Sequence, residues 1–330
     1  MSRKWRCLVL GGLVALGAGL HASAASGADV RMTRSEEYGG TRFDFRLRGR
    51  GFSYRCFVIL PKEACRLNVL LTWNGLRVFP VILPPEPRPW VWYAPALRDR
   101  YPNRWHTWYF SRLLKAGVAV CGIDVGESWG NPKGRAAFSH FYKFVVKHWR
   151  FNCVPKACML PECRGGLMVY NWAAENPGRV QCIGAIYPVC EITATPFFAR
   201  IYGLASDEKL SLKALKDHFK SHNPMDRLKP LADAKIPILH LHGSLDKVVP
   251  ALQHSAALAR RYLKLGGTIT VMIRRGERHE PSAMLFECKE FARFLIRQAR
   301  RTRPSGRSWP ITLPVRTDPK ATPEKEKHKE

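Results

Sequence analysis

Acidic residues are scarce in this chain. It holds 26 Asp and Glu against 54 Lys and Arg, a formal net charge of +28 at pH 7. Residues 301–330 supply little of that excess, which is spread along the chain rather than gathered on one helix or motif, and this argues against a nucleic-acid partner. The charge favours contact with anionic surfaces or acidic polymers, although a generally basic exported protein would have it too.

Metal-ligand motifs are also missing. The chain has 10 cysteines, but none forms a Cys-x-x-Cys pair or a Cys/His spacing, which argues against a bound metal. Cys121, Cys158 and Cys182 lie within apolar runs, where a free thiol usually acts as a small core hydrophobe. If the protein is exported, disulfides become feasible, and Cys56 with Cys65 is the most plausible pair.

Long apolar segments are confined to the N-terminus. Residues 1–6 are basic, residues 7–20 are apolar, and residues 21–24 offer an A-x-A cleavage site. This layout is typical of a signal peptide. We therefore expect residues 1–28 to be removed and the protein to be periplasmic or secreted, with no stable membrane insertion.

The rest of the chain predicts an α/β protein. Strands are expected at 90–94, 118–125, 156–162, 180–187, 236–242 and 268–274, and helices at 108–116, 134–149, 164–176, 251–265 and 282–299. Such alternation is typical of a mainly parallel, doubly wound sheet with helices on both faces. Asn74-Gly75, between two apolar runs, predicts a hairpin with a type I′ turn.

Composition predicts the domain organisation. Residues 29–66 are expected to form an N-terminal extension with two alternating segments, and residues 67–300 the α/β domain. Residues 191–230 interrupt the alternation and are interpreted as a small cap beside the site. Residues 301–330 are rich in Pro, Arg, Lys and Glu without periodicity, which predicts a disordered basic tail.

A reactive side chain stands between a short strand and a helix. Residues 157–160 form an apolar run, and the helix that follows must stop near Asn176-Pro177. Cys163 lies between them and is followed by Arg164 and two glycines, which is the layout of a nucleophile elbow. The glycines let the helix pack against the strand, and the Arg164 amide can face a developing oxyanion. Cys163 replaces the serine of the usual G-x-S-x-G pattern, and Pro161 replaces its first glycine.

An acid and a base follow two later strands. Asp246 comes after the strand at 236–242, and His279 comes after the strand at 268–274. Hydrolases built on such a sheet place nucleophile, acid and histidine in this chain order, each beyond the carboxyl end of a strand. We therefore predict that Asp246 and His279 lie within hydrogen-bond reach, with the Cys163 sulfur near the other imidazole nitrogen.

Residues from about 90 to 296 resemble the α/β-hydrolase superfamily, in particular a bacterial exported branch with serine at the elbow. The resemblance rests on 164–167, 171–177, 187–190, 223–224, 242–250, 262–267 and 286–288. It implies an α/β-hydrolase fold and a triad of Cys163, Asp246 and His279. A cysteine at this position is seen in dienelactone hydrolase-like enzymes.

The expected activity is cleavage of a carboxylic ester or thioester through an acyl-enzyme. Cys163 would attack, His279 would act as base and then acid, Asp246 would orient His279, and backbone amides at Arg164 and near Ala94 would bind the oxyanion. This chemistry needs no cofactor. The expected substrate is a small-molecule or polymer-linked ester, and the positive charge of the protein would favour an anionic one.

Three other interpretations remain open. The same fold could serve a peptidase, or a binding protein that has lost turnover. Gly126 to Gly130 also spells G-x-S-x-G around Ser128, but Asn131-Pro132 delays the next helix, which favours a site wall or a helix-capping turn. His240 and His242 alternate along a strand and are expected to be structural.

Overall fold

The computed structural model describes residues 30–49, 52–62, 68–73, 78–83, 87–95, 102–126, 128–192 and 220–302. Nine strands form one sheet in the order β1-β2-β3-β7-β6-β8-β9-β10-β11. Their bounds are β1 Met32–Glu37, β2 Gly40–Gly49, β3 Phe52–Pro61, β6 Trp90–Ala94, β7 Ala119–Asp124, β8 Ala157–Pro161, β9 Val180–Ile186, β10 Ile238–Gly243 and β11 Ile269–Arg274. The six strands from β7 through β6, β8, β9 and β10 to β11 are parallel to their neighbours. The pairs β1–β2, β2–β3 and β3–β7 are antiparallel.

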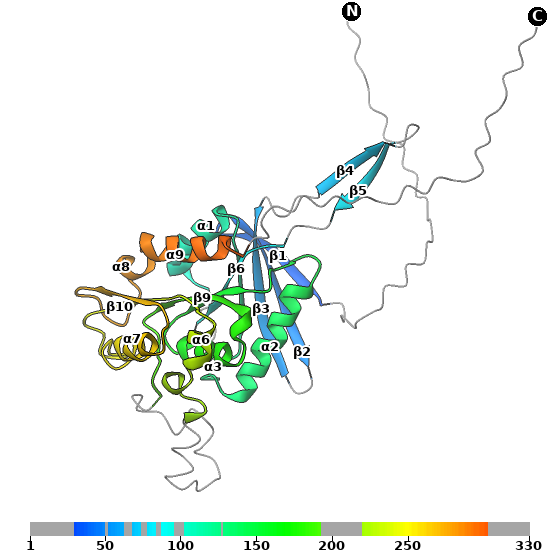
Figure 1. Cartoon of the computed structure of the whole chain (residues 1–330). Helices are drawn as coiled ribbons and strands as arrows, with labels where there is room; N and C mark the ends of the chain where they lie inside the picture. The colour runs from blue at the N-terminus through cyan, green and yellow to red at the C-terminus, as the bar shows by residue number, and fades with distance from the viewer. Residues whose placement is uncertain are drawn as a thin grey trace, which may run out of the picture.

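Helices cover both faces of this sheet, as Figure 1 shows. Their bounds are α1 Thr107–Lys115, α2 Pro132–Lys147, α3 Gly165–Glu175, α6 Lys229–Asp233, α7 Ser255–Lys264, α8 Ala283–Phe286 and α9 Lys289–Arg300. Helices α1 and α9 pack on one face, over a core that includes Phe110 and Phe291, and α2, α3 and α7 pack on the other, over a core that includes Phe138 and Leu258. The predicted two-faced, mainly parallel sheet is confirmed.

Strand β6 shows why the central strands of the sheet are continuously apolar in sequence. Trp92 is fully buried against α2 and α3, with ring centroids 4.8 Å from Phe138 and 5.0 Å from Trp172. Tyr93 faces the opposite core, 5.3 Å from Phe110 of α1. A strand covered on both faces must be apolar at every position, because its two sides both contact a core.

Local signals set the helix boundaries. The Asn131 side chain accepts a hydrogen bond from the Gly134 amide at 2.8 Å, so α2 begins at Pro132, two residues before the predicted start. The single helix predicted over 282–299 is two helices. Cys288 has an extended backbone, φ −71° and ψ 109°, and separates α8 from α9.

The segment predicted as an N-terminal extension belongs to the sheet. Strands β1, β2 and β3, within 29–66, occupy one edge of it, and β3 pairs with β7. The predicted hairpin forms β4 (Asn68–Trp73) and β5 (Val78–Leu83), which pair in a separate two-stranded sheet that Figure 1 shows apart from the larger one.

Several expectations fall outside the described residues. These are the signal peptide (1–28), most of the cap (193–219) and most of the tail (303–330). Cys56 is a free thiol in β3, and Cys65, its predicted disulfide partner, lies outside the described residues. Within the described ranges, no helix has both the length and the hydrophobicity that crossing a bilayer requires.

Candidate active site

Cys163 occupies a sharp turn between β8 and α3. Its φ of 52° lies in the left-handed region, which a residue with a Cβ adopts at a cost unless its surroundings fix it. Three backbone hydrogen bonds fix it here. The Cys163 amide donates to Ile186 O at 3.1 Å, and its carbonyl accepts from the amides of Gly166 at 3.0 Å and Val189 at 2.8 Å. The side chain remains partly exposed.

The residues around Cys163 allow this turn. A Cβ on Gly165 would overlap the carbonyl oxygen of Ala94, and one on Gly166 would lie 2.9 Å from the Pro188 Cβ. Pro161 ends β8 without disturbing it, because the Glu162 amide takes up the hydrogen bond to Ala94 O at 3.2 Å. The two glycines therefore have the packing role predicted for them, and Pro161 does not prevent the elbow from forming.

The structure brings Cys163, His279 and Asp246 together. The Cys163 Sγ lies 3.1 Å from His279 Nε2, and His279 Nδ1 lies 2.8 Å from Asp246 Oδ2. Asp246 follows β10, His279 follows β11, and Cys163 follows β8. The three side chains meet because the carboxyl ends of these parallel strands share one edge of the sheet.

Asp246 is buried and surrounded by donors. Its Oδ1 accepts hydrogen bonds from the amides of Val248 at 3.0 Å and Val249 at 2.7 Å, while Oδ2 faces His279 and His242. Burial disfavours the carboxylate, but the hydrogen bonds from His242, His279 and the Val249 amide outweigh that and hold the pKa of Asp246 well below its ordinary value. The acid is therefore ionised across the working range of pH.

His279 is set up to hold an extra proton. Burial disfavours its imidazolium, but the hydrogen bonds with Asp246 and Cys163 outweigh burial and raise the pKa of His279 to about 9. A raised value on the histidine favours transfer of the thiol proton to it. The 3.1 Å contact therefore places His279 to act as the base for Cys163.

Tyr187 and Glu162 form one wall of the site. The Tyr187 ring lies 4.4 Å from the His279 ring, and its hydroxyl donates to Glu162 Oε1 at 3.0 Å. Glu162 Oε2 also lies 3.2 Å from the Tyr93 hydroxyl and 3.0 Å from His106 Nε2. The residue before the nucleophile is thus held from both sides. Sequence reasoning missed this wall, because Tyr93 and His106 carry no motif of their own.

The two predicted oxyanion positions flank the elbow. Arg164 is the N-cap residue of α3, directly after Cys163, and its guanidinium lies 4.9 Å from the Trp129 ring. Ala94 ends β6 and is buried, with its carbonyl oxygen facing the elbow. The next residue is Pro95, which has no amide hydrogen. A donor from the turn beyond Pro95 would come from 96–101, outside the described residues.

Ser128 does not join this site. Its hydroxyl is buried under the start of α2, where a Cβ on Gly134 would lie 2.5 Å from Ser128 Oγ. Its carbonyl accepts from the Asn131 amide at 2.8 Å, in the turn before the helix. Within the described ranges its hydroxyl has no partner, and no group of three or more His, Cys, Asp or Glu could hold a metal ion.

His242, which the sequence predicts to be structural, contacts the candidate acid. His242 Nε2 lies 3.2 Å from the same Asp246 oxygen that His279 contacts, and the Ser255 hydroxyl lies 2.8 Å from His242 Nδ1. The position of His242, four residues before the acid at the end of a buried strand, was the only available signal.

Comparison with known proteins supports this assignment of the fold. A family model, the prolyl oligopeptidase family, matches residues 163–302. No curated protein matches the sequence. Among solved structures, an S-formylglutathione hydrolase from Agrobacterium tumefaciens is 14% identical with a TM-score of 0.61, over 82% of this chain and 99% of that one.

Two further structures are similar. A thermostable esterase is 15% identical with a TM-score of 0.53, over 78% of this chain and 62% of that one. Dipeptidyl peptidase 4 from Porphyromonas gingivalis is 13% identical with a TM-score of 0.56, over 78% of this chain and 35% of that one. Together with the sheet order and the elbow between β8 and α3, these likenesses show that the chain has the α/β-hydrolase fold.

Proposed function

We propose that this protein is a hydrolase that cleaves a carboxylic ester or thioester through an acyl-enzyme formed on Cys163. The observation that carries the proposal is the unbroken contact from nucleophile to acid: Sγ to Nε2 at 3.1 Å, then Nδ1 to Asp246 Oδ2 at 2.8 Å. These distances lie within the range at which a base can take the proton of a nucleophile.

The geometry supports a two-step reaction. His279 Nε2 takes the thiol proton, and the Cys163 sulfur bonds to the substrate carbonyl carbon, giving a tetrahedral oxyanion. As the bond to the leaving alcohol or thiol breaks, His279 returns the proton to it. Water then attacks the acyl-cysteine with His279 as base, which releases the acid and restores the thiol.

The oxyanion needs backbone donors, and the elbow offers a place for them. Arg164 begins the turn into α3, so its amide belongs to the end of a helix where N–H groups face outward. We assign the second donor to the turn after β6, near Ala94, whose carbonyl already packs on the elbow.

A peptidase is the second candidate, because the family match over 163–302 is to peptidases. We prefer ester cleavage because the similarity to the S-formylglutathione hydrolase extends over 99% of that chain, whereas the similarity to dipeptidyl peptidase 4 extends over 35% of that chain.

We propose that the protein works outside the cytoplasm and prefers anionic esters. Support comes from the signal-peptide pattern at 1–28 and from the net charge of +28. Two measurements test this. The intact mass of protein from periplasm and medium should lack residues 1–28, and kcat/KM for an anionic ester should fall with added salt more than for its neutral analogue.

A substrate panel tests the activity. Purified protein should hydrolyse short acyl esters and thioesters, lose that activity on treatment with iodoacetamide, and lose it in Cys163→Ala. The matched control is Ser128→Ala, which should retain full activity. Release of free amine from peptides without ester cleavage would favour the peptidase. Absence of turnover on every substrate, despite normal folding, would favour a binding protein.

A further inference from the structure

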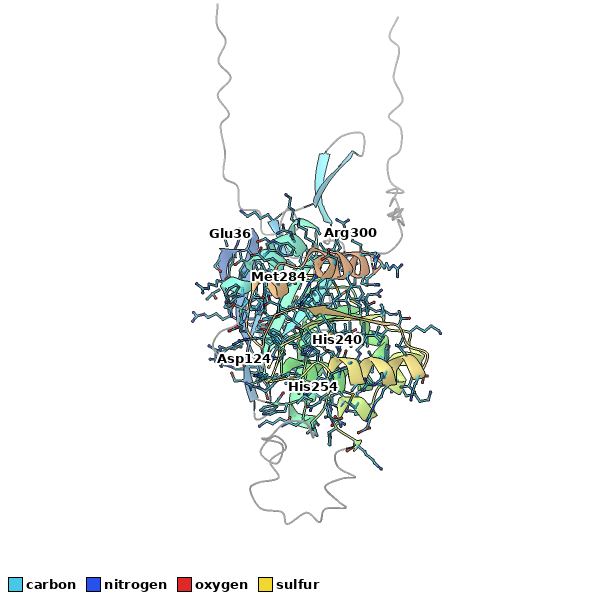
Figure 2. The ribbon with its side chains drawn as sticks, turned by 90° about the vertical axis from the view of Figure 1, so that its left-hand side faces the viewer. Glu36, Asp124, His240, His254, Met284 and Arg300 are labelled. Atoms are coloured by element: carbon cyan, nitrogen blue, oxygen red, sulfur yellow. The ribbon has the colours of Figure 1, made fainter. Side chains whose placement is uncertain are left out.

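A second chain of polar contacts leads to Asp246 Oδ2, the oxygen that His279 also contacts. His242 Nε2 contacts Asp246 Oδ2 at 3.2 Å, and His242 Nδ1 lies 2.8 Å from Ser255 Oγ. Ser255 Oγ also lies 2.9 Å from His240 Nδ1, whose Nε2 is 2.6 Å from the Tyr170 hydroxyl. All four residues are buried, and Figure 2 shows His240 beside α7, the helix that begins at Ser255.

The direction of each hydrogen bond follows from the number of protons available. Among the described residues, the Tyr170 hydroxyl contacts His240 Nε2 alone, so it must donate there to avoid a buried, unpaired proton. Burial, aided by the neighbouring His242, lowers the pKa of His240 to about 3. His240 is therefore neutral, carries its proton on Nδ1 and donates to Ser255. The Ser255 hydroxyl therefore donates its own proton to His242 Nδ1.

The contacts of His242, at the other end of these hydrogen bonds, give the same proton positions independently. His242 Nε2 lies 2.6 Å from the carbonyl oxygen of Val249, which can only accept. Nε2 must therefore carry a proton, as it does when Nδ1 accepts from Ser255. Starting from Tyr170 or from Val249 thus gives one arrangement, in which each donor points towards His242. The proton on His242 Nε2 is shared between the Val249 carbonyl at 2.6 Å and Asp246 Oδ2 at 3.2 Å.

We propose that Tyr170, His240, Ser255 and His242 form a relay of positioning residues that keeps Asp246 ionised and its Oδ2 aimed at His279. This inference rests on the proposed function, because Asp246 is taken as the acid of the triad. Hydrogen bonds that point one way polarise one another, so the donor at the end of the relay is stronger than an isolated histidine.

The relay also joins the parts of the fold that carry the site. His240 and His242 lie on β10, which leads to Asp246, and Ser255 opens α7. Tyr170 lies on α3, the helix that begins directly after the elbow. The acid is thereby tied to the helix that follows Cys163, through buried side chains rather than through the exposed side of the site.

Alkylation of Cys163 by iodoacetamide tests the relay without requiring any substrate. Near neutral pH, the rate should fall about tenfold in His242→Phe, the cost of losing one hydrogen bond to a charged group. It should fall several-fold in Ser255→Ala and about threefold in Tyr170→Phe, which removes only the hydroxyl group. On an ester substrate, kcat should fall by similar factors while KM stays constant.

The matched control is Ser139→Ala, which removes a hydroxyl that accepts from Trp172 Nε1 at 3.0 Å, outside the relay. It should alkylate like the native protein. A lower melting temperature with unchanged alkylation in Tyr170→Phe and Ser255→Ala would overturn the proposal, since a merely structural role predicts that result. Slower alkylation in the relay variants, with no ester hydrolysed by any protein, would support the relay and reject the proposed function.

Discussion

The ring of Tyr187 lies 4.4 Å from the ring of His279, at an interplanar angle of 48°, while its hydroxyl holds Glu162, the residue before the nucleophile. One side chain therefore positions both the base and the elbow. Tyr187 has a φ of 34°, and its amide donates to Leu241 O at 2.8 Å in the neighbouring strand β10. The wall of the site is thus fixed by the sheet itself.

Tyr187 should matter more for its ring than for its hydroxyl. Tyr187→Ala removes the surface that confines His279, and we expect kcat to fall about tenfold or more because the base is misplaced. Tyr187→Phe keeps that surface and should stay within about threefold of the native value. Steady-state kinetics on one ester measure both, and equal losses in the two variants would assign the role to the hydroxyl.

The imidazole of His279 should make the free energy of unfolding depend on pH. The pKa of His279 is raised from 6.5 to about 9 in the folded state. The stabilisation from its proton is therefore fully present below pH 6.5 and is lost as pH rises through about 9. Urea unfolding of the native protein and His279→Gln should show a difference in unfolding free energy that shrinks from about pH 6 to about pH 10. A difference that is constant across this range would contradict the assignment.

The elbow should not tolerate a side chain at Gly165. A methyl group there would overlap the Ala94 carbonyl, so Gly165→Ala should destabilise the fold by about 3 kcal/mol and abolish activity. Gly178→Ala is the matched control, because nothing lies within 4 Å of a Cβ at Gly178. Thermal unfolding of the two variants should separate them clearly, and equal melting temperatures would mean that the elbow is looser than described.

An oxygen nucleophile should work in this site. Cys163→Ser keeps the contacts to His279 and Asp246, and we expect ester hydrolysis at least as fast as in the native protein. Because the turn already forms with Pro161 in place, Pro161→Gly in the same background should add little. The test is kcat on short acyl esters, and a folded but inactive Cys163→Ser would show that the pocket requires a thiol.

The sequence predicted the site better than it predicted the edge of the sheet. Cys163, Asp246 and His279 each follow a strand of the parallel sheet. Their order along the chain was therefore enough to predict that they lie close together. Strands β2 and β3 were recognised as alternating segments, but alternation does not show which sheet a strand joins, and they pair with each other and with β7.

The relay could not be predicted, for a different reason. His240 and His242 were visible on one strand, but their role depends on Ser255 standing between them and on Tyr170 arriving from another helix. Contacts between distant segments have no local signature. The break at Cys288 was missed similarly, because apolar periodicity continues from α8 into α9.

The central claim is that Cys163 carries the acyl group. Mass spectrometry of the intact protein, quenched in acid during reaction with a slowly hydrolysed acyl ester, tests it most directly. We predict a mass increase of one acyl group, located by peptide mapping on Cys163 and absent from Cys163→Ala. An acyl group on Ser128, or ester hydrolysis by Cys163→Ala at the native rate, would contradict the account.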